Sequence, residues 1–215
     1  MKETEYAATL RNLNYFPYIP KLGKMPYDSK TDEIESMDTE HKILEYIRHV
    51  PPHVHITFFY EAASSKDKML SAFFDRKTTL NVAKGLLAEK PFEPNYVNNL
   101  SYGELFSTEK HSVIEKLSTW VNAVHSTNQS NKPTRIADED VTWWFRNDLA
   151  KEHQKLEQTL GKYLVDNMSV LCAYNTSNIE KDKLHSIVES HGVVIFDNPF
   201  MAYAWSGREP PLFLS

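Results

Sequence analysis

The chain has 215 residues, of which 41% are hydrophobic and 25% charged, and its formal net charge is −5. This length and balance predict one globular domain that buries a sizeable core without a disulfide or metal staple. The basic residues form no dominant cluster, which disfavours direct binding to nucleic acid, because phosphate contacts require grouped Lys and Arg.

The cysteine content and the length of the apolar runs indicate the cellular compartment. The lone cysteine, Cys172, excludes an internal disulfide framework and fits a reducing compartment. No apolar run is long enough to span a bilayer, and the amino terminus lacks the continuous apolar segment of a signal peptide. We therefore expect a soluble, cytoplasmic protein with no membrane partner.

Residues 1–38 predict an amino-terminal arm, and residues 39–215 predict a single α/β domain. In the arm, Pro17 and Pro20 interrupt a group of aromatic residues, which favours an extended segment over a helix. After the arm, apolar residues at helical spacing predict a short helix that ends at Pro51.

Buried strands are predicted by runs of β-branched and aromatic residues. These runs cover residues 54–60, 95–101, 134–137, 168–174 and 193–196. Amphipathic spacing predicts three long helices, which cover residues 109–126, 142–165 and 181–190. Strands that alternate with helices favour a mostly parallel central sheet with helices on both faces, which is a three-layer α/β domain.

A further helix is expected directly after the first strand. Ser64 and Asp67 have the spacing of a capping box, which predicts the start of that helix. Ala83 and Leu86 indicate that the helix continues or restarts as far as Pro91.

Three histidines, His49, His53 and His55, surround two prolines ahead of the first strand. His53 and His55 have the spacing that places two side chains on one face of a strand, which is one way to begin a metal site. A zinc site needs three or four ligands, so His191 or a carboxylate would have to approach in the fold. The simpler alternative is that these histidines frame the strand, and we expect no metal.

The stretch "ITFFYEAASSKDKML", residues 56–70, lies where a phosphate-binding loop would join a strand to a helix. A working loop of this kind needs glycines and a Lys-Ser or Lys-Thr pair. This stretch has neither, and Glu61 would repel phosphate. The sequence therefore argues against ATP hydrolysis and implies no cofactor.

The stretch "RIADEDVTWWF", residues 135–145, combines three acids with two tryptophans. The acids either bind a divalent cation or are solvated residues at the start of a helix. The tryptophans either line a ligand pocket or place one ring in the core. Cys172 is predicted to be inert packing, because the sequence reveals no activating base beside it.

The ordered set of these motifs resembles the MEDS domain, the sensory domain of methanogen and methylotroph regulators of the dichloromethane-responsive type. The resemblance is carried by "HVHITFFYE", by "TRIADEDVTWW" and by the run from Leu156 to Ile195, and it covers roughly residues 41–197. The matching residues are His55, Phe59, Tyr60, Arg135, Thr142, Trp143, Leu171, Cys172, Tyr174 and His191. The family implies a RecA/KaiC-like fold without a nucleotide-binding loop, and it implies a role in sensing hydrocarbon derivatives.

The sequence departs from the family pattern at several steps. The acidic family position falls on Glu139 or Asp140, Asn175 stands where the family has Asp, and Gly192 follows His191 in place of Pro. The family's second strand is not recognisable in residues 84–101.

These observations together predict a non-enzymatic sensory or regulatory domain of three-layer RecA-like fold. A small-molecule ligand is expected beyond the carboxyl ends of the strands, with signalling through a partner regulator or a homo-oligomer. The candidate binding residues are Tyr60, Glu61, Arg135, Glu139, Trp143 and Tyr174. Arg135 would hold an anionic group or, alternatively, pair internally with Glu139 or Asp140.

Two other functions remain open from the sequence. One is a nucleotide-binding enzyme derived from a RecA-like ATPase. The other is a structural interaction module whose amino-terminal arm docks on another protomer.

Overall fold

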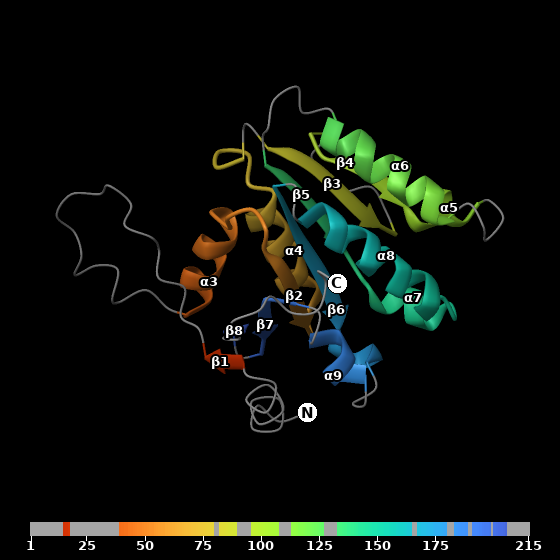
Figure 1. Ribbon diagram of the computed structural model, residues 1–215. Coiled ribbons are helices and arrows are strands. Elements are labelled where there is room, and N and C mark those ends of the chain that lie inside the picture. Colours follow the sequence, from red (N-terminus) through yellow and green to blue (C-terminus); the bar gives the residue numbers. More distant parts are fainter. Residues whose placement is uncertain are drawn as a thin grey trace.

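The computed structural model describes residues 15–17, 39–79, 82–89, 96–107, 113–126, 133–164, 167–179, 183–188, 191–198 and 200–205. These residues form an eight-stranded sheet in the order β1-β8-β7-β2-β6-β5-β3-β4 (Figure 1). The strands are β1 (Tyr15–Pro17), β2 (His55–Tyr60), β3 (Ala83–Ala88), β4 (Asn98–Ser101), β5 (Thr134–Asp138), β6 (Met168–Asn175), β7 (Val193–Asp197) and β8 (Phe200–Trp205). All neighbouring strands from β7 to β4 are parallel, whereas β8 is antiparallel to both β7 and β1.

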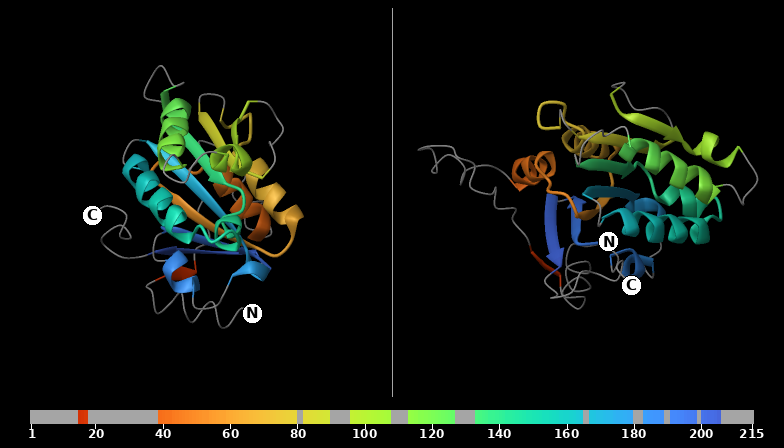
Figure 2. Two further views of the ribbon diagram at one scale, coloured as in Figure 1. Left: turned by 90° about the vertical axis from the view of Figure 1, so that its right-hand side faces the viewer. Right: turned by 45° about the horizontal axis from the view of Figure 1, so that its top comes forward.

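Helices cover both faces of this sheet. They are α3 (Thr39–Arg48), α4 (Ala63–Phe73), α5 (Tyr102–Phe106), α6 (Val113–Ser126), α7 (Thr142–Arg146), α8 (Ala150–Leu164) and α9 (Lys183–Val188), with a short 3₁₀ helix, η2 (Thr176–Asn178). Helices α3 and α4 lie on one face, and α6 and α8 lie on the other (Figure 2). The predicted three-layer α/β architecture with a mostly parallel sheet is therefore confirmed. Within the part of the chain that the structure describes, none of the helices has the length and apolar composition that crossing a membrane requires.

Strand β2 is buried on both faces because it lies in the interior of the sheet, between β6 and β7, where a layer of helices covers each side. Ile56, Phe58 and Tyr60 pack into the core on the α3–α4 side. Phe59 packs into the core on the opposite side. This two-sided burial explains why the strand reads as a nearly continuous apolar run in the sequence.

The segment expected to extend the helix after β2 forms strand β3 instead. Ala83 and Leu86 belong to this strand, which pairs with β5 on one side and β4 on the other. Gly85 lies so close to α6 that an added Cβ would sit 2.9 Å from a ring carbon of Trp120. The prediction of a helix was wrong because pairing with two distant strands outweighs the weak helical preference of a six-residue segment.

The helix predicted over residues 142–165 is divided into α7 and α8. Asp148 adopts the left-handed conformation, with φ of 56°, and it interrupts the helix there. Leu149 and Leu156 are buried as expected, whereas the side chains of Leu160 and Leu164 lie outside the described residues.

Residues 15–17 of the predicted arm add a strand to the edge of the sheet. Their partners lie in β8, with Tyr15 opposite Trp205 and Pro17 opposite Tyr203. Proline is tolerated in an edge strand because the strand pairs on one side only. Strand β8 was not predicted from the sequence, and it carries residues 15–17 on its outer side.

The connections reverse direction beside β2. The chain leaves β2 toward β3 on one side of the sheet, and it leaves β6 toward β7 on the other side. In open α/β sheets, ligands bind beyond the carboxyl ends of strands where such a reversal occurs. Tyr60 and Asn175 are paired at this point, so the loops that follow β2 and β6 frame the expected site.

Arg135, the second residue of β5, joins the sheet to two helix ends. Its Nη1 donates to the Phe73 carbonyl at 2.7 Å. Its Nη2 donates to the Arg48 and Val50 carbonyls, both at 3.1 Å. Helix carboxyl termini expose carbonyls that need donors, so one buried guanidinium caps both α3 and α4.

We expect Arg135→Met to lower the free energy of unfolding by about 2 kcal/mol or more, because it leaves buried carbonyls without their donors. Urea denaturation would measure this loss. Lys68→Met is the matched control, since Lys68 pairs with Glu40 between the same two helices at the surface, and we expect it to change stability by less than about 0.5 kcal/mol. Equal stability of the two variants would contradict the capping role.

Candidate functional site

The two predicted binding tyrosines lie on opposite faces of the sheet. Tyr60 packs on the side of α3 and α4, whereas Tyr174 packs on the side of α6 and α8. Both are buried, and burial raises the pKa of each phenol above its ordinary value. Neither tyrosine side chain therefore projects into solvent at the carboxyl ends of the strands.

The expected grouping of Arg135 with these residues requires correction. Arg135 lies near the amino end of β5, at the edge of the sheet opposite the carboxyl ends. Its partners are the helix carbonyls described above, and the alternative pairing with Glu139 or Asp140 is also wrong. Burial lowers the pKa of its guanidinium to about 10, which keeps it charged at neutral pH.

The acids that follow β5 have separate roles. Glu139 forms an ion pair with Lys66 of α4. Asp140 accepts hydrogen bonds from the backbone of Thr142 at 3.1 Å and from the side chain of Arg146 at 3.0 Å, so it stabilises the start of α7.

The two adjacent tryptophans differ in burial: Trp144 lies in the core, and Trp143 lies partly at the surface. Trp144 is fully buried, as one alternative expected. Trp143 is half-buried, and its ring stacks on Tyr102 with 4.4 Å between the ring centroids. Trp143 also lies 5.1 Å from the ring of Phe106, so its aromatic surface is used within the fold.

The loop that follows β2 is closed by the chain's own carboxylate. The backbone nitrogens of Glu61 and Ala62 donate to the side chain of Asp197 at 3.0 Å and 3.2 Å. Asn198 donates to the carboxylate of Glu61 at 2.8 Å. We call this set of contacts the Asp197 bridge. It occupies the amides at the start of α4, where a nucleotide-binding protein would hold phosphate.

The predicted capping box at the start of α4 was wrong. The N-cap residue is Ala62, which has no side-chain oxygen, and the helix begins at Ala63. Ser64 therefore lies within the first turn. Asp197 comes from β7, far along the chain, so local spacing did not reveal that it supplies the negative charge near this helix end.

A narrow crevice lies beside the Asp197 bridge. Its residues are Phe59, Glu61, Thr176, Phe196, Asp197, Asn198 and Met201. The rings of Phe59 and Phe196 stack 5.1 Å apart and form an apolar floor, and the polar residues form the rim. The interior volume is about 20 Å³, which is enough for a single water molecule.

A second group of polar residues is buried inside the domain, between the sheet and α8. His55 of β2, Glu157 of α8, Cys172 of β6 and His191 before β7 form this group, which we call the buried cluster. None of them is more than 7% exposed. The Nε2 atom of His55 lies 3.3 Å from the Cys172 sulfur and 3.5 Å from Glu157 Oε2. The Cys172 sulfur lies 3.4 Å from Glu157 Oε1.

The charges within the buried cluster are tightly coupled. Burial opposes ionisation of Glu157, but His55, His153 and His191 together outweigh burial and hold the pKa of this carboxyl below its ordinary value. Burial and the Glu157 charge raise the pKa of the Cys172 thiol. The thiol is therefore protonated at neutral pH, and Cys172 is no activated nucleophile in this state.

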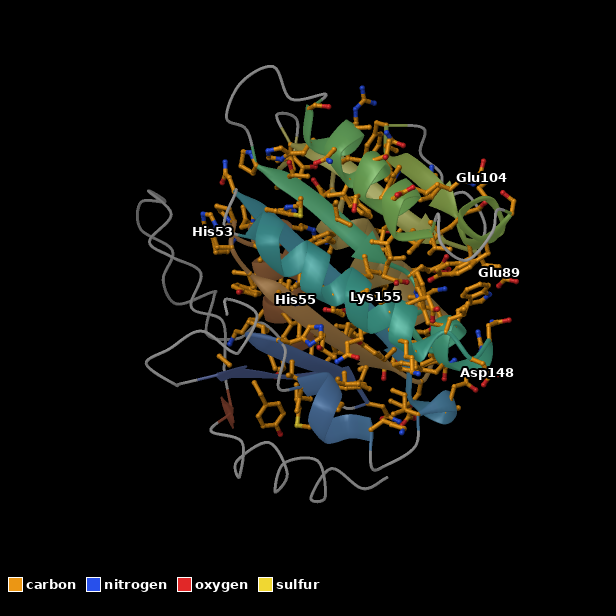
Figure 3. All side chains as sticks on the ribbon, turned by 45° about the vertical axis from the view of Figure 1, so that its right-hand side comes forward. His53, His55, Glu89, Glu104, Asp148 and Lys155 are labelled. Atoms are coloured by element: carbon orange, nitrogen blue, oxygen red, sulfur yellow. The ribbon has the colours of Figure 1, made fainter. Side chains whose placement is uncertain are left out.

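The structure separates the two histidines that the sequence paired. His55 lies in the body of the domain, whereas His53 lies at its periphery (Figure 3) and is exposed. His191 is the histidine that meets His55, with 3.9 Å between the ring centroids. A metal site at His55 requires that His191 or a carboxylate approach it, and both His191 and the Glu157 carboxylate do so.

Sequence reasoning missed His153 and Glu157 of α8. His153 Nε2 lies 3.2 Å from Glu157 Oε1, at the i, i+4 spacing of one helix face. The sequence did contain a signal for them. His153 and Glu157 follow Leu149 at intervals of four residues, so they lie on the same inward face of α8 as Leu156. Two polar residues on the apolar side of a helix indicate a buried polar contact.

Asp138 is also buried, contrary to the solvated role that one alternative gave it. It accepts hydrogen bonds from the Tyr102 hydroxyl and from Trp144 Nε1 at 2.9 Å. Burial outweighs these donors and the nearby His153, and it raises the pKa of this carboxyl to about 7.

This shift predicts a pH dependence of stability. Between the ordinary pKa of 3.8 and about 7, the folded protein holds the Asp138 proton and the unfolded chain does not. The contribution of Asp138 to stability therefore falls as pH rises through this window, by up to about 1.4 kcal/mol per pH unit. We expect Asp138→Asn to remove that slope, as measured by urea denaturation from pH 4 to pH 8 and compared with the unsubstituted protein. The exposed Asp148→Asn is the control, and a slope retained in Asp138→Asn would contradict the assignment.

Comparison with known proteins finds no match among models of protein families or among curated proteins. Among solved structures, the chain is similar to a KaiC-like protein from the hyperthermophilic archaeon Pyrococcus horikoshii, at 8% identity over 74% of this chain and 81% of that chain, with a TM-score of 0.45. It is also similar to the flagellar accessory protein FlaH from Methanocaldococcus jannaschii, at 12% identity over 68% of this chain and 72% of that chain, with a TM-score of 0.39. These similarities are too low to assign a function to the chain.

Proposed function

We propose that this chain is a non-enzymatic sensory or regulatory domain that binds a small organic molecule at the crevice beside β2, β6 and β7. Binding is transmitted to a partner regulator or to a second copy of the chain. The observation that carries this proposal is the Asp197 bridge, because it closes the phosphate position of the sheet with an internal carboxylate.

The location of the crevice supports ligand binding. It lies where the connections of the sheet reverse direction, which is the usual ligand position in an open α/β sheet. Its apolar floor, with Phe59 and Phe196, and its polar rim, with Thr176 and Asn198, have the composition of a small-molecule site.

The same residues disfavour a nucleotide. The amides of Glu61 and Ala62 already have an acceptor in Asp197. The Asp197 and Glu61 carboxylates repel a phosphate group, and residues 61–66 lack the glycines of a phosphate-binding loop. A small ligand that is neutral fits this environment better than ATP does.

The size of the crevice implies that it opens on binding. A space of about 20 Å³ admits nothing larger than a water molecule. An organic ligand must therefore separate the loop after β2 from the end of β7, where Asp197 and Asn198 lie. The Asp197 bridge is the contact that this separation breaks.

Opening of the crevice at Asp197 would move strands near one edge of the sheet. Asp197 pairs with Phe200, and the β7–β8 hairpin that they close carries the arm residues 15–17 on its outer side. A ligand that displaces Asp197 would thus shift the hairpin and residues 15–17, which provides a physical route to a partner surface.

Of the predicted binding residues, Glu61 lines the crevice. Tyr174 lies below the crevice, with its ring 5.5 Å from that of Phe59. Glu139 borders the start of α4 through its ion pair with Lys66, which was not predicted. We retain Glu61, Glu139 and Tyr174 in the proposed site and leave out Arg135.

A ligand screen with a bridge variant tests this proposal. We expect at least one neutral small organic compound, from a panel of short alcohols, ketones and halogenated hydrocarbons, to raise the melting temperature of the full chain. Asn198→Ala removes a hydrogen bond that holds the crevice closed. The variant should bind the same compound about two- to fivefold more tightly in calorimetry, because opening then costs less free energy.

Asn178→Ala is the matched control, since Asn178 is an exposed asparagine of η2 that does not line the crevice. It should leave the affinity unchanged. A panel that shifts nothing would overturn the proposal. Stabilisation by Mg²⁺–ATP together with measurable hydrolysis would favour the nucleotide-binding alternative instead.

A further inference from the structure

We propose that His55, Glu157, Cys172 and His191 form a tetrahedral binding site for Zn²⁺, with all four protein ligands supplied from inside the domain. The site goes beyond the proposed ligand crevice and shares no residue with it. It joins β2, β6, the start of β7 and α8.

The spacing of the ligand atoms fits one metal ion. Zinc lies roughly 2.0–2.3 Å from nitrogen, oxygen and sulfur ligands, so the ligand atoms of a tetrahedron lie about 3.3–3.8 Å from one another. His55 Nε2 lies 3.3 Å from the Cys172 sulfur. The Glu157 carboxylate approaches that sulfur to 3.4 Å through Oε1 and His55 Nε2 to 3.5 Å through Oε2. One ligand atom of each of the four residues lies within 4.8 Å of the others.

The donor set favours zinc over hard cations. Two imidazoles, one thiolate and one carboxylate are the ligand types that Zn²⁺ binds in four-coordinate sites. Ca²⁺ and Mg²⁺ need six or more oxygen ligands, which this group does not provide. The thiolate and the carboxylate together carry two negative charges, so they neutralise a divalent ion that is fully buried.

A hydrogen bond and an ion-pair contact outside the ligand set hold two of the ligands in position. Nδ1 of His191 lies 2.6 Å from the Ile187 carbonyl, which can only accept. His191 therefore carries its proton on Nδ1 and directs the lone pair on Nε2 toward the cluster. His153 approaches Glu157 Oε1 at 3.2 Å and orients the carboxylate, so His153 is a positioning residue.

Metal binding has a defined proton balance. Glu157 is already ionised, whereas the Cys172 thiol must lose its proton to form a sulfur–zinc bond. An imidazolium at His55 must likewise lose its Nε2 proton before this atom binds the metal. At least one proton therefore passes to solvent for each Zn²⁺ bound, and affinity should rise with pH. Because four protein ligands complete the coordination, the site is closed to substrate, and its role is to fix α8 against the sheet.

Metal content and a cobalt spectrum test the proposal on the untagged full chain. After saturation with Zn²⁺ and removal of excess metal, we expect one Zn²⁺ per chain by elemental analysis. Co²⁺ should give the visible bands of a tetrahedral ion together with a thiolate-to-cobalt charge-transfer band, and Zn²⁺ should displace it. Zinc should also raise the melting temperature relative to protein treated with chelator.

Three variants separate the ligands from their neighbours. Loss of an outer hydrogen-bond partner typically weakens metal affinity by about 10- to 100-fold, so His153→Gln should fall in that range. Cys172→Ser removes a direct ligand and should weaken affinity by at least about 100-fold, with loss of the charge-transfer band. His53→Asn is the matched control, because His53 is an exposed histidine two residues from His55, and it should bind Zn²⁺ as the unsubstituted protein does.

The proposal is overturned if the unsubstituted protein binds no stoichiometric zinc. It is also overturned if Cys172→Ser matches the unsubstituted affinity, or if His53→Asn is the variant that loses the metal. Should Cys172→Ser fail to fold, which circular dichroism with chelator would reveal, the cobalt spectrum of the unsubstituted protein decides. Absence of the thiolate band then counts against the site.

Discussion

The position of β2 between β6 and β7 is the constraint on which the rest of the structure depends. Parallel pairing sets Thr57 opposite Cys172, which brings His55 on the same face of β2 next to that cysteine. Parallel pairing of β2 with β7 on its other side sets Phe59 opposite Phe196 at the floor of the crevice. Because side chains alternate between faces, a register shift of one residue would separate the members of both sites.

Three buried ionisable groups in the described part of this domain have polar partners close by. The Arg135 guanidinium meets helix carbonyls, the Asp138 carboxyl meets a phenol and an indole, and the Glu157 carboxylate meets imidazoles. Burial without such partners is costly, so the loss of any of these contacts would destabilise the fold. The two carboxyls differ in outcome, since positive neighbours keep Glu157 ionised whereas burial keeps Asp138 largely protonated below neutral pH.

The crevice and the buried cluster are separate sites that share one aromatic neighbour. The ring of Tyr174 lies 5.5 Å from Phe59 at the crevice floor and 6.2 Å from His191 in the cluster. A metal that fixes His191 would therefore stiffen the support beneath the crevice. In such a domain the metal would maintain the ligand site, while the Asp197 bridge would respond to the ligand.

The sequence by itself determined the strands β2, β5, β6 and β7, the helices α3 and α6, and the three-layer arrangement, because apolar periodicity and strand composition are local properties. It also identified the missing phosphate-binding residues and named His55 and His191 as possible neighbours. Only the tertiary structure decided that Ala83–Ala88 is a strand, that Arg135 caps two helices and that Asp197 closes the loop after β2. It likewise placed Glu157 beside Cys172. These contacts join segments that are distant in the chain, and their partners are set by strand order and register, which local sequence patterns do not encode.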